Sequence, residues 1–211
     1  MSKDFDKILT EKGIKFLPWI GEDYFNFSPR ILILGESHYF NEDLSKNKEL
    51  MDEYNNNVNT TRDVVEDYCN KGYLNLASML TNKIIDNDII WDYICFYNFF
   101  QKYVGFYSSD KSLIDESLIE MSQKAFFNVV EILSPDLIIA WGVTKLYWEW
   151  LPQDNCEIID EENKLFKYKQ YPKTVIWNMN HPSSPKFDLY EWTYKFKDTI
   201  CKRLKITYPI K

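Results

Sequence analysis

The sequence predicts an α/β fold: a three-layer α/β/α sandwich with a short central sheet of four parallel strands. Several apolar runs, such as residues 31–34 and 137–140, lack polar alternation, which is typical of strands that are buried on both faces. Helical patterns separate these runs, and such alternation is typical of a parallel sheet covered by helices. A chain of 211 residues with 45% hydrophobic residues can build one good core, so we expect a single domain over residues 1–211.

The strand assignments follow from the apolar runs and the residues that end them. The four predicted strands cover residues 31–35, 93–97, 137–141 and 174–179. Gly35 ends the first strand and lets the backbone turn sharply. Residues 16–21 are apolar but show no helical or strand period, so we expect a loop that packs under the first strand. Residues 156–171 alternate around a polar turn, which predicts a hairpin outside the parallel sheet.

Helices are predicted between and around these strands. They cover residues 2–13, two segments within 42–71 separated by a loop, and then 72–85, 112–133, 143–150 and 188–205. The second helix within 42–71 is expected to begin near Thr60, with Thr60 or Thr61 as its cap. The long helix at 112–133 is expected to end before Pro135, because the residue preceding a proline avoids helical geometry.

Charge is distributed unevenly along the chain. The formal net charge of −7 argues against a protein that coats nucleic acid non-specifically. Residues 164–211, however, contain 11 Lys and Arg but only 3 Asp and Glu. A local surface that contacts phosphate groups is therefore compatible with the composition.

Cysteine spacing and hydropathy exclude several classes of protein. The four cysteines show no Cys-x-x-Cys pair, so they fit neither a zinc ribbon nor a clustered iron–sulfur site. We expect no cofactor and no bound metal. No secretory segment or long apolar span is present, which predicts a cytoplasmic protein without a membrane partner. The sequence leaves the oligomeric state open.

Reactive side chains gather after the first strand. Directly after Gly35 come Glu36, Ser37, His38 and Tyr39. The only other histidine, His181, follows the last predicted strand. Ligands of open α/β sheets bind beyond the carboxyl ends of the strands. We therefore expect these two segments to share one site.

Asn98 follows the second predicted strand and suggests a ligand class. An Asn amide can pair with the edge of a base, a Tyr ring can stack on it, and a His can stabilise charge on a carbonyl oxygen. With Tyr39 and His181 at the same sheet edge, these groups are suited to a flat heterocycle. We expect a nucleobase, a nucleotide or a base in DNA as the ligand.

The order of these motifs resembles that of the uracil-DNA glycosylase superfamily. Residues 35–39, Gly-Glu-Ser-His-Tyr, are similar to the G-Q-D-P-Y and G-E-A-P-G segments of two of its branches. Asn98 is placed like the family's Asn that reads the pyrimidine edge, and residues 135–142 resemble its third strand. His181 begins a segment similar to the family's H-P-S motif. The resemblance spans about residues 30–190.

The resemblance implies a DNA glycosylase that hydrolyses the N-glycosidic bond of uracil or a modified base. The catalytic residues that it implies are Glu36, Ser37, His38 and His181. Substrate binding would involve Gly35, Tyr39, Tyr73 and Asn98, with Tyr73 matching the base-stacking aromatic at a helix start. The residues expected to contact DNA are Ser183, Ser184, Lys186 and Phe187.

The chain also departs from the family pattern. Ser37 stands where the best-known branch has the carboxylate that positions water, and His38 replaces the usual proline. Glu36 matches the acid of the G-E-A-P-G branch, and residues 41–43 resemble that branch's downstream N-E-D, but the cysteine spacing does not fit its iron–sulfur cluster. The leucine wedge after H-P-S is absent, which leaves residues 185–187 to fill the gap in the DNA.

Two other functions remain open from the residues alone. Glu36, His38 and His181 could form a metal site of two histidines and one carboxylate, as in a metal-dependent hydrolase. Alternatively, the chain could bind a nucleotide, a modified base or a protein partner without chemistry, which would suit its net negative charge and the missing Asp.

Overall fold

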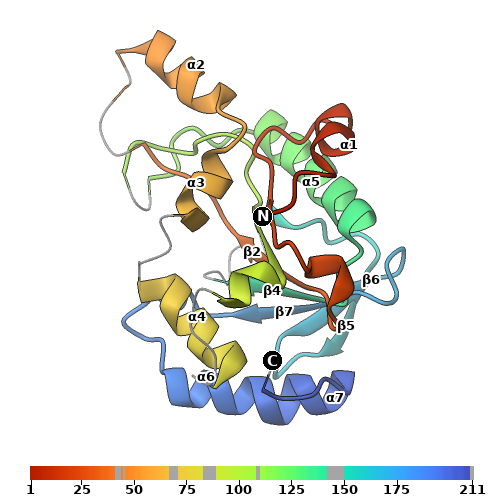
Figure 1. Cartoon of the computed structure of the whole chain (residues 1–211). Coiled ribbons are helices and arrows are strands. Elements are labelled where there is room, and N and C mark those ends of the chain that lie inside the picture. Colours follow the sequence, from red (N-terminus) through yellow and green to blue (C-terminus); the bar gives the residue numbers. More distant parts are fainter. Residues whose placement is uncertain are drawn as a thin grey trace.

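A computed structural model describes residues 1–40, 44, 46–66, 71–82, 89–107, 110–141 and 150–209. This part of the chain folds around a seven-stranded sheet of order β1-β3-β2-β4-β7-β6-β5 (Figure 1). The strands are β1 Trp19–Ile20, β2 Ile31–Gly35, β3 Ile94–Asn98, β4 Leu137–Trp141, β5 Cys156–Asp160, β6 Leu165–Tyr168 and β7 Val175–Met179.

The α/β class is confirmed, but the prediction of a four-stranded sheet is wrong. The four predicted strands do form the parallel centre, β3-β2-β4-β7. The predicted hairpin at 156–171 forms, yet its strand β6 pairs antiparallel with β7 and extends the sheet. Residues 16–21, predicted as a loop, contain β1, which pairs antiparallel with β3. A strand of two residues is too short to show a period in the sequence.

The described helices are α1 Asp6–Glu11, α2 Lys48–Asn56, α3 Thr60–Glu66, α4 Lys71–Thr81, α5 Glu116–Leu133, α6 Leu189–Lys195 and α7 Lys202–Leu204, with a π-helical turn Phe196–Cys201 between the last two. Helix α5 begins later than predicted because the Asp115 carboxylate caps it, accepting a bond of 2.7 Å from the Leu118 N–H. Three segments with predictions lie outside the described residues: most of the helix predicted at 143–150, the end of the helix predicted at 72–85, and residues 41–43.

Each central strand is buried on both faces, which explains its mainly apolar sequence; Asn98 of β3 and Asn178 of β7 are buried polar exceptions. Alternate residues of β2 point to opposite faces: Leu32 and Leu34 pack in the cluster that includes Leu9 of α1 and Phe126 of α5. Ile31 and Ile33 pack in the cluster that includes the buried residues of α4 and α6. The described residues contain no helix that is long and apolar enough to cross a membrane.

The strand order determines where a ligand would bind. After β2 the chain forms β3 on one side of it, and later returns to form β4 on the other side. Such a reversal opens a crevice at the carboxyl ends of the two diverging strands. Glu36 directly follows β2, and His181 follows β7, the neighbour of β4. The topology therefore places both segments at this edge of the sheet.

Candidate functional site

Glu36 is held by two side chains that are distant in the sequence. The Lys111 ammonium group forms an ion pair with Glu36 Oε1, and the Trp150 indole N–H donates to the same oxygen at 3.1 Å. The Glu36 side chain retains 15% exposure. The carboxylate therefore has a fixed orientation while part of it still reaches solvent.

His181 presents a defined tautomer. The backbone N–H of Ser183 donates to His181 Nδ1 at 3.1 Å, and the Ser183 hydroxyl lies 2.6 Å from the same atom. Because a backbone N–H can only donate, Nδ1 is the acceptor, and the neutral ring carries its proton on Nε2. Burial lowers the pKa of His181, while the charge of Glu36 acts in the opposite direction. His181 thus offers a neutral N–H donor within the electrostatic reach of the Glu36 carboxylate.

The loop that carries His181 is ordered by its own hydrogen bonds. The Ser184 N–H donates to the His181 carbonyl at 2.8 Å, and the Phe187 N–H donates to the Ser184 carbonyl at 3.0 Å. From α4, the Asn75 side-chain amide donates to the Pro182 carbonyl at 2.7 Å. The His181 ring packs on Trp141, with 5.1 Å between ring centroids. These contacts fix the imidazole relative to the sheet edge.

His38 lies in the interior, where it serves as a hydrogen-bond acceptor. Its side chain is 7% exposed. The Asn98 amide nitrogen lies 2.9 Å from His38 Nε2, and the Thr61 hydroxyl lies 3.1 Å from it. An amide nitrogen can only donate, so Nε2 accepts and the ring proton is on Nδ1.

The amide of Asn98 is consequently oriented. Its nitrogen points at His38, and its oxygen lies against Gly35. A Cβ atom at position 35 would lie only 2.0 Å from Asn98 Oδ1. A side chain at position 35 would therefore displace the Asn98 amide from this orientation, a role of Gly35 that the sequence pattern alone does not reveal.

The burial of His38 predicts an acid-sensitive fold. Burial lowers the pKa of His38 from 6.5 to about 3, so the unfolded chain takes up a proton between these pH values while the folded chain does not. Stability should therefore be complete above about pH 6.5 and fall as the pH drops toward 3. His38→Gln, which retains an acceptor for Asn98, should show a shallower decline. Urea unfolding at a series of pH values measures both slopes, and equal slopes would contradict this assignment.

The tyrosines predicted to bind substrate differ in exposure. Tyr39 is half-buried, and burial raises the pKa of its hydroxyl. Tyr73 is 6% exposed and packs against the rings of Trp91, Phe96 and Trp141 at centroid distances of 5.4, 5.5 and 5.3 Å. Trp141 in turn contacts the His181 ring, so Tyr73 belongs to the layer of rings that supports this imidazole.

The residues predicted to contact DNA lie on the loop between β7 and α6. Ser183 and Lys186 are exposed, whereas Ser184 and Phe187 are half-buried. The Phe187 ring stacks on Trp192, with an interplanar angle of 3°. Phe187 is therefore packed against the protein, and Ser183 contributes to the orientation of His181.

The structure does not bring Glu36, His38 and His181 together as a metal-binding group. Among the described residues, no group of three His, Cys, Asp or Glu side chains is arranged to hold a metal ion. His38 Nε2 is occupied by Asn98 and Thr61, and His181 Nδ1 is occupied by Ser183.

Sequence reasoning did not identify four supporting residues: Thr61, Asn75, Lys111 and Trp150. Lys111 and Trp150 reach Glu36 from 75 and 114 residues away. Thr61 and Asn75 lie in helices and contact the two histidine-bearing segments. Their roles depend on how the chain packs, and no local motif marks them.

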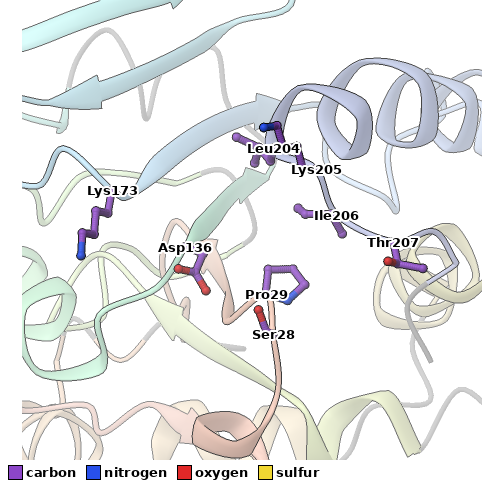
Figure 2. Close-up of a pocket in the computed structure, with 8 residues that line it drawn as sticks. All are labelled: Ser28, Pro29, Asp136, Lys173, Leu204, Lys205, Ile206 and Thr207. Carbon is purple, nitrogen blue, oxygen red and sulfur yellow. The ribbon is translucent and has the colours of Figure 1, made fainter.

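A separate pocket lies at the opposite edge of the sheet (Figure 2). It has a volume of about 400 Å³ and is lined by Ser28, Pro29, Asp136, Lys173 and residues 204–207. Residues 28, 136 and 173 precede β2, β4 and β7, so this pocket is at the amino ends of the parallel strands. It contains none of the predicted site residues.

No family model matches this sequence, and no curated protein matches it. The functional argument therefore rests on geometry: a held carboxylate and a neutral imidazole at one edge of the sheet, and a buried amide whose orientation is fixed.

Proposed function

We propose that this protein hydrolyses the N-glycosidic bond of uracil or a modified base in DNA, as a divergent relative of the uracil-DNA glycosylases that it resembles. The observation that supports this most is the combination of His181 and Glu36. The His181 ring is neutral with its proton on Nε2, and the charge of the Glu36 carboxylate affects the pKa of this ring. A neutral donor and a fixed negative charge are the two groups that this reaction needs.

The chemistry follows from the charges that develop during bond cleavage. The sugar gains cationic character, and the departing base gains negative charge. His181 would donate from Nε2 to a carbonyl oxygen of the base, and Glu36 would orient water or stabilise the sugar cation. Lys111 and Trp150 hold the carboxylate in place before the substrate arrives. The base must first leave its stack, at a cost of a few kcal/mol.

Base recognition would depend on Asn98. With its nitrogen bonded to His38, the amide offers its oxygen as the acceptor for a ligand. Together with the donor on His181, this arrangement suits a base that carries an N–H group beside a carbonyl group, as uracil does. His38 would act in this reaction by positioning Asn98, rather than by contacting the substrate.

A base-release assay tests this proposal. Purified protein from a host lacking its own uracil-DNA glycosylase is incubated with single- and double-stranded oligonucleotides that carry uracil, hypoxanthine or other modified bases, and abasic sites are detected by alkaline cleavage. We expect release from at least one substrate and none with Glu36→Gln. Failure to release any base, together with binding of a free base at this site, would overturn the hydrolytic assignment.

Replacing Asn98 tests the assignment of base recognition. Asn98→Ala should change the relative release of different bases more than it changes the melting temperature, because the amide supplies an acceptor to the ligand. The same substrate panel and thermal unfolding measure the two effects. Equal loss on all substrates, in proportion to a loss of stability, would show that Asn98 is structural only.

A non-catalytic module that binds a base or nucleotide is the second candidate. The observation that favours it is the ion pair of Glu36 with Lys111, which already engages the Glu36 carboxylate, while Ser37 replaces the usual acid. This candidate would be favoured if the Glu36→Gln variant binds free bases while neither this variant nor the wild-type protein releases a base from DNA.

A further inference from the structure

Helix α6 presents two tyrosines to solvent on one face. The side chains of Tyr190 and Tyr194 are 84% and 60% exposed. Residues four apart on a helix are neighbours on its surface, so the two rings form one patch. The opposite face of the helix is buried, since Trp192 and Phe196 pack against Trp177 of β7 at centroid distances of 5.6 and 5.9 Å.

Two lysines precede and follow these tyrosines in the chain. Lys186 and Lys197 are exposed, and neither has a carboxylate partner among the residues that the structure describes. Three other cations between α6 and α7 are engaged: Lys195 pairs with Glu191, Lys202 with Asp198, and Arg203 with Asp160. Two ammonium groups are therefore available, one before and one after the tyrosines in the chain, within the basic part of an otherwise acidic sequence.

Helix α6 follows the loop of the candidate site directly in the chain. The hydrogen-bonded loop after β7 leads from His181 directly into α6 (Figure 1). The stack of Phe187 on Trp192 joins this loop to the helix, and the Asp188 carboxylate caps the helix by accepting from the Glu191 N–H at 2.9 Å. Residues 182–188 alone separate His181 from α6 in the chain, so the tyrosines follow the segment that would hold the base.

We propose that the surface formed by Lys186, Tyr190, Tyr194 and Lys197 binds single-stranded nucleic acid. Exposed bases would stack on the two tyrosine rings, and the lysines would neutralise phosphates. The exposed face of α6 carries flat amphipathic rings and charges. Positions 191–193, between the two tyrosines, hold no aliphatic side chain, so this face lacks the wide apolar stripe with which helices bind membranes. This inference extends the proposed function from the base to the strand that carries it.

Fluorescence anisotropy with a labelled thymidine 12-mer tests the stacking role. This probe contains no uracil, so binding is measured without hydrolysis. The double variant Tyr190→Leu/Tyr194→Leu should lose affinity about tenfold or more, because stacking on a flat ring is lost. Tyr190→Phe/Tyr194→Phe keeps the rings and should bind like the wild type. Equal binding by the Leu and Phe variants, or equal affinity for a duplex of the same length, would overturn the proposal.

The salt dependence of binding tests the charges. Lys186→Gln/Lys197→Gln should reduce the slope of log affinity against log salt by about 1.4, as expected for two lost phosphate contacts to a single strand. Lys7→Gln, an exposed lysine on α1, is the control and should leave the slope unchanged. An unchanged slope in the double variant would contradict the assigned contacts. If the wild-type protein binds the 12-mer but releases no base, the proposed hydrolytic function is contradicted and the binding surface is not. If it releases bases but does not bind the 12-mer through these residues, the binding surface alone is contradicted.

Discussion

Replacing His181 with Ala should lower the rate of base release about a hundredfold or more, which is the scale of losing one preorganised donor in an active site. The reason is the fixed tautomer: Ser183 occupies Nδ1, so the N–H on Nε2 is available to stabilise the negative charge on the departing base. Single-turnover kinetics on the best substrate measure the chemical step directly.

Ser183→Ala is the matched control for this experiment. It removes the hydroxyl but keeps the backbone N–H that bonds to Nδ1, so we expect a much smaller loss of rate than in His181→Ala. Thermal unfolding of both variants checks that the contact between the His181 ring and Trp141 is not responsible. A folded His181→Ala protein that releases bases at the wild-type rate would contradict the proposed role.

Replacing Asp6 with Asn should lower the free energy of unfolding by about 3 kcal/mol, because it leaves a buried guanidinium group without its counter-ion. Arg62 has a side chain that is 2% exposed, and it forms a two-pronged ion pair with Asp6 at 2.9 and 2.5 Å. The same guanidinium group donates to the Pro18 carbonyl at 3.1 Å. This pair ties α3 to the N-terminal segment, and urea denaturation measures its loss.

Glu191→Gln provides the comparison for an exposed pair. Glu191 and Lys195 are four residues apart on α6 with side chains 55% and 40% exposed, so the loss should be below about 0.5 kcal/mol. If Asp6→Asn lowered the free energy of unfolding by no more than Glu191→Gln does, the stabilisation that we assign to the buried ion pair of Arg62 would be contradicted.

The sequence by itself determined the centre of the fold. Mainly apolar runs predicted all four parallel strands to within one residue at either end, because burial on both faces leaves few polar positions. The long helix α5 was predicted for a similar reason, since its apolar period and the proline after it are local signals. The same strand ends identified the segments that carry both histidines.

Only the tertiary structure decided which side chains at the sheet edge meet. His38 turns inward to accept from Asn98 and Thr61, whereas His181 packs on Trp141 with its donor available. Glu36 is held by Lys111 and Trp150, which are distant from it in the sequence. The hairpin β5–β6 joined the sheet because the outer edge of β7 offered unpaired backbone groups. Such contacts depend on strand order and loop paths, which long-range packing determines and a local pattern does not contain.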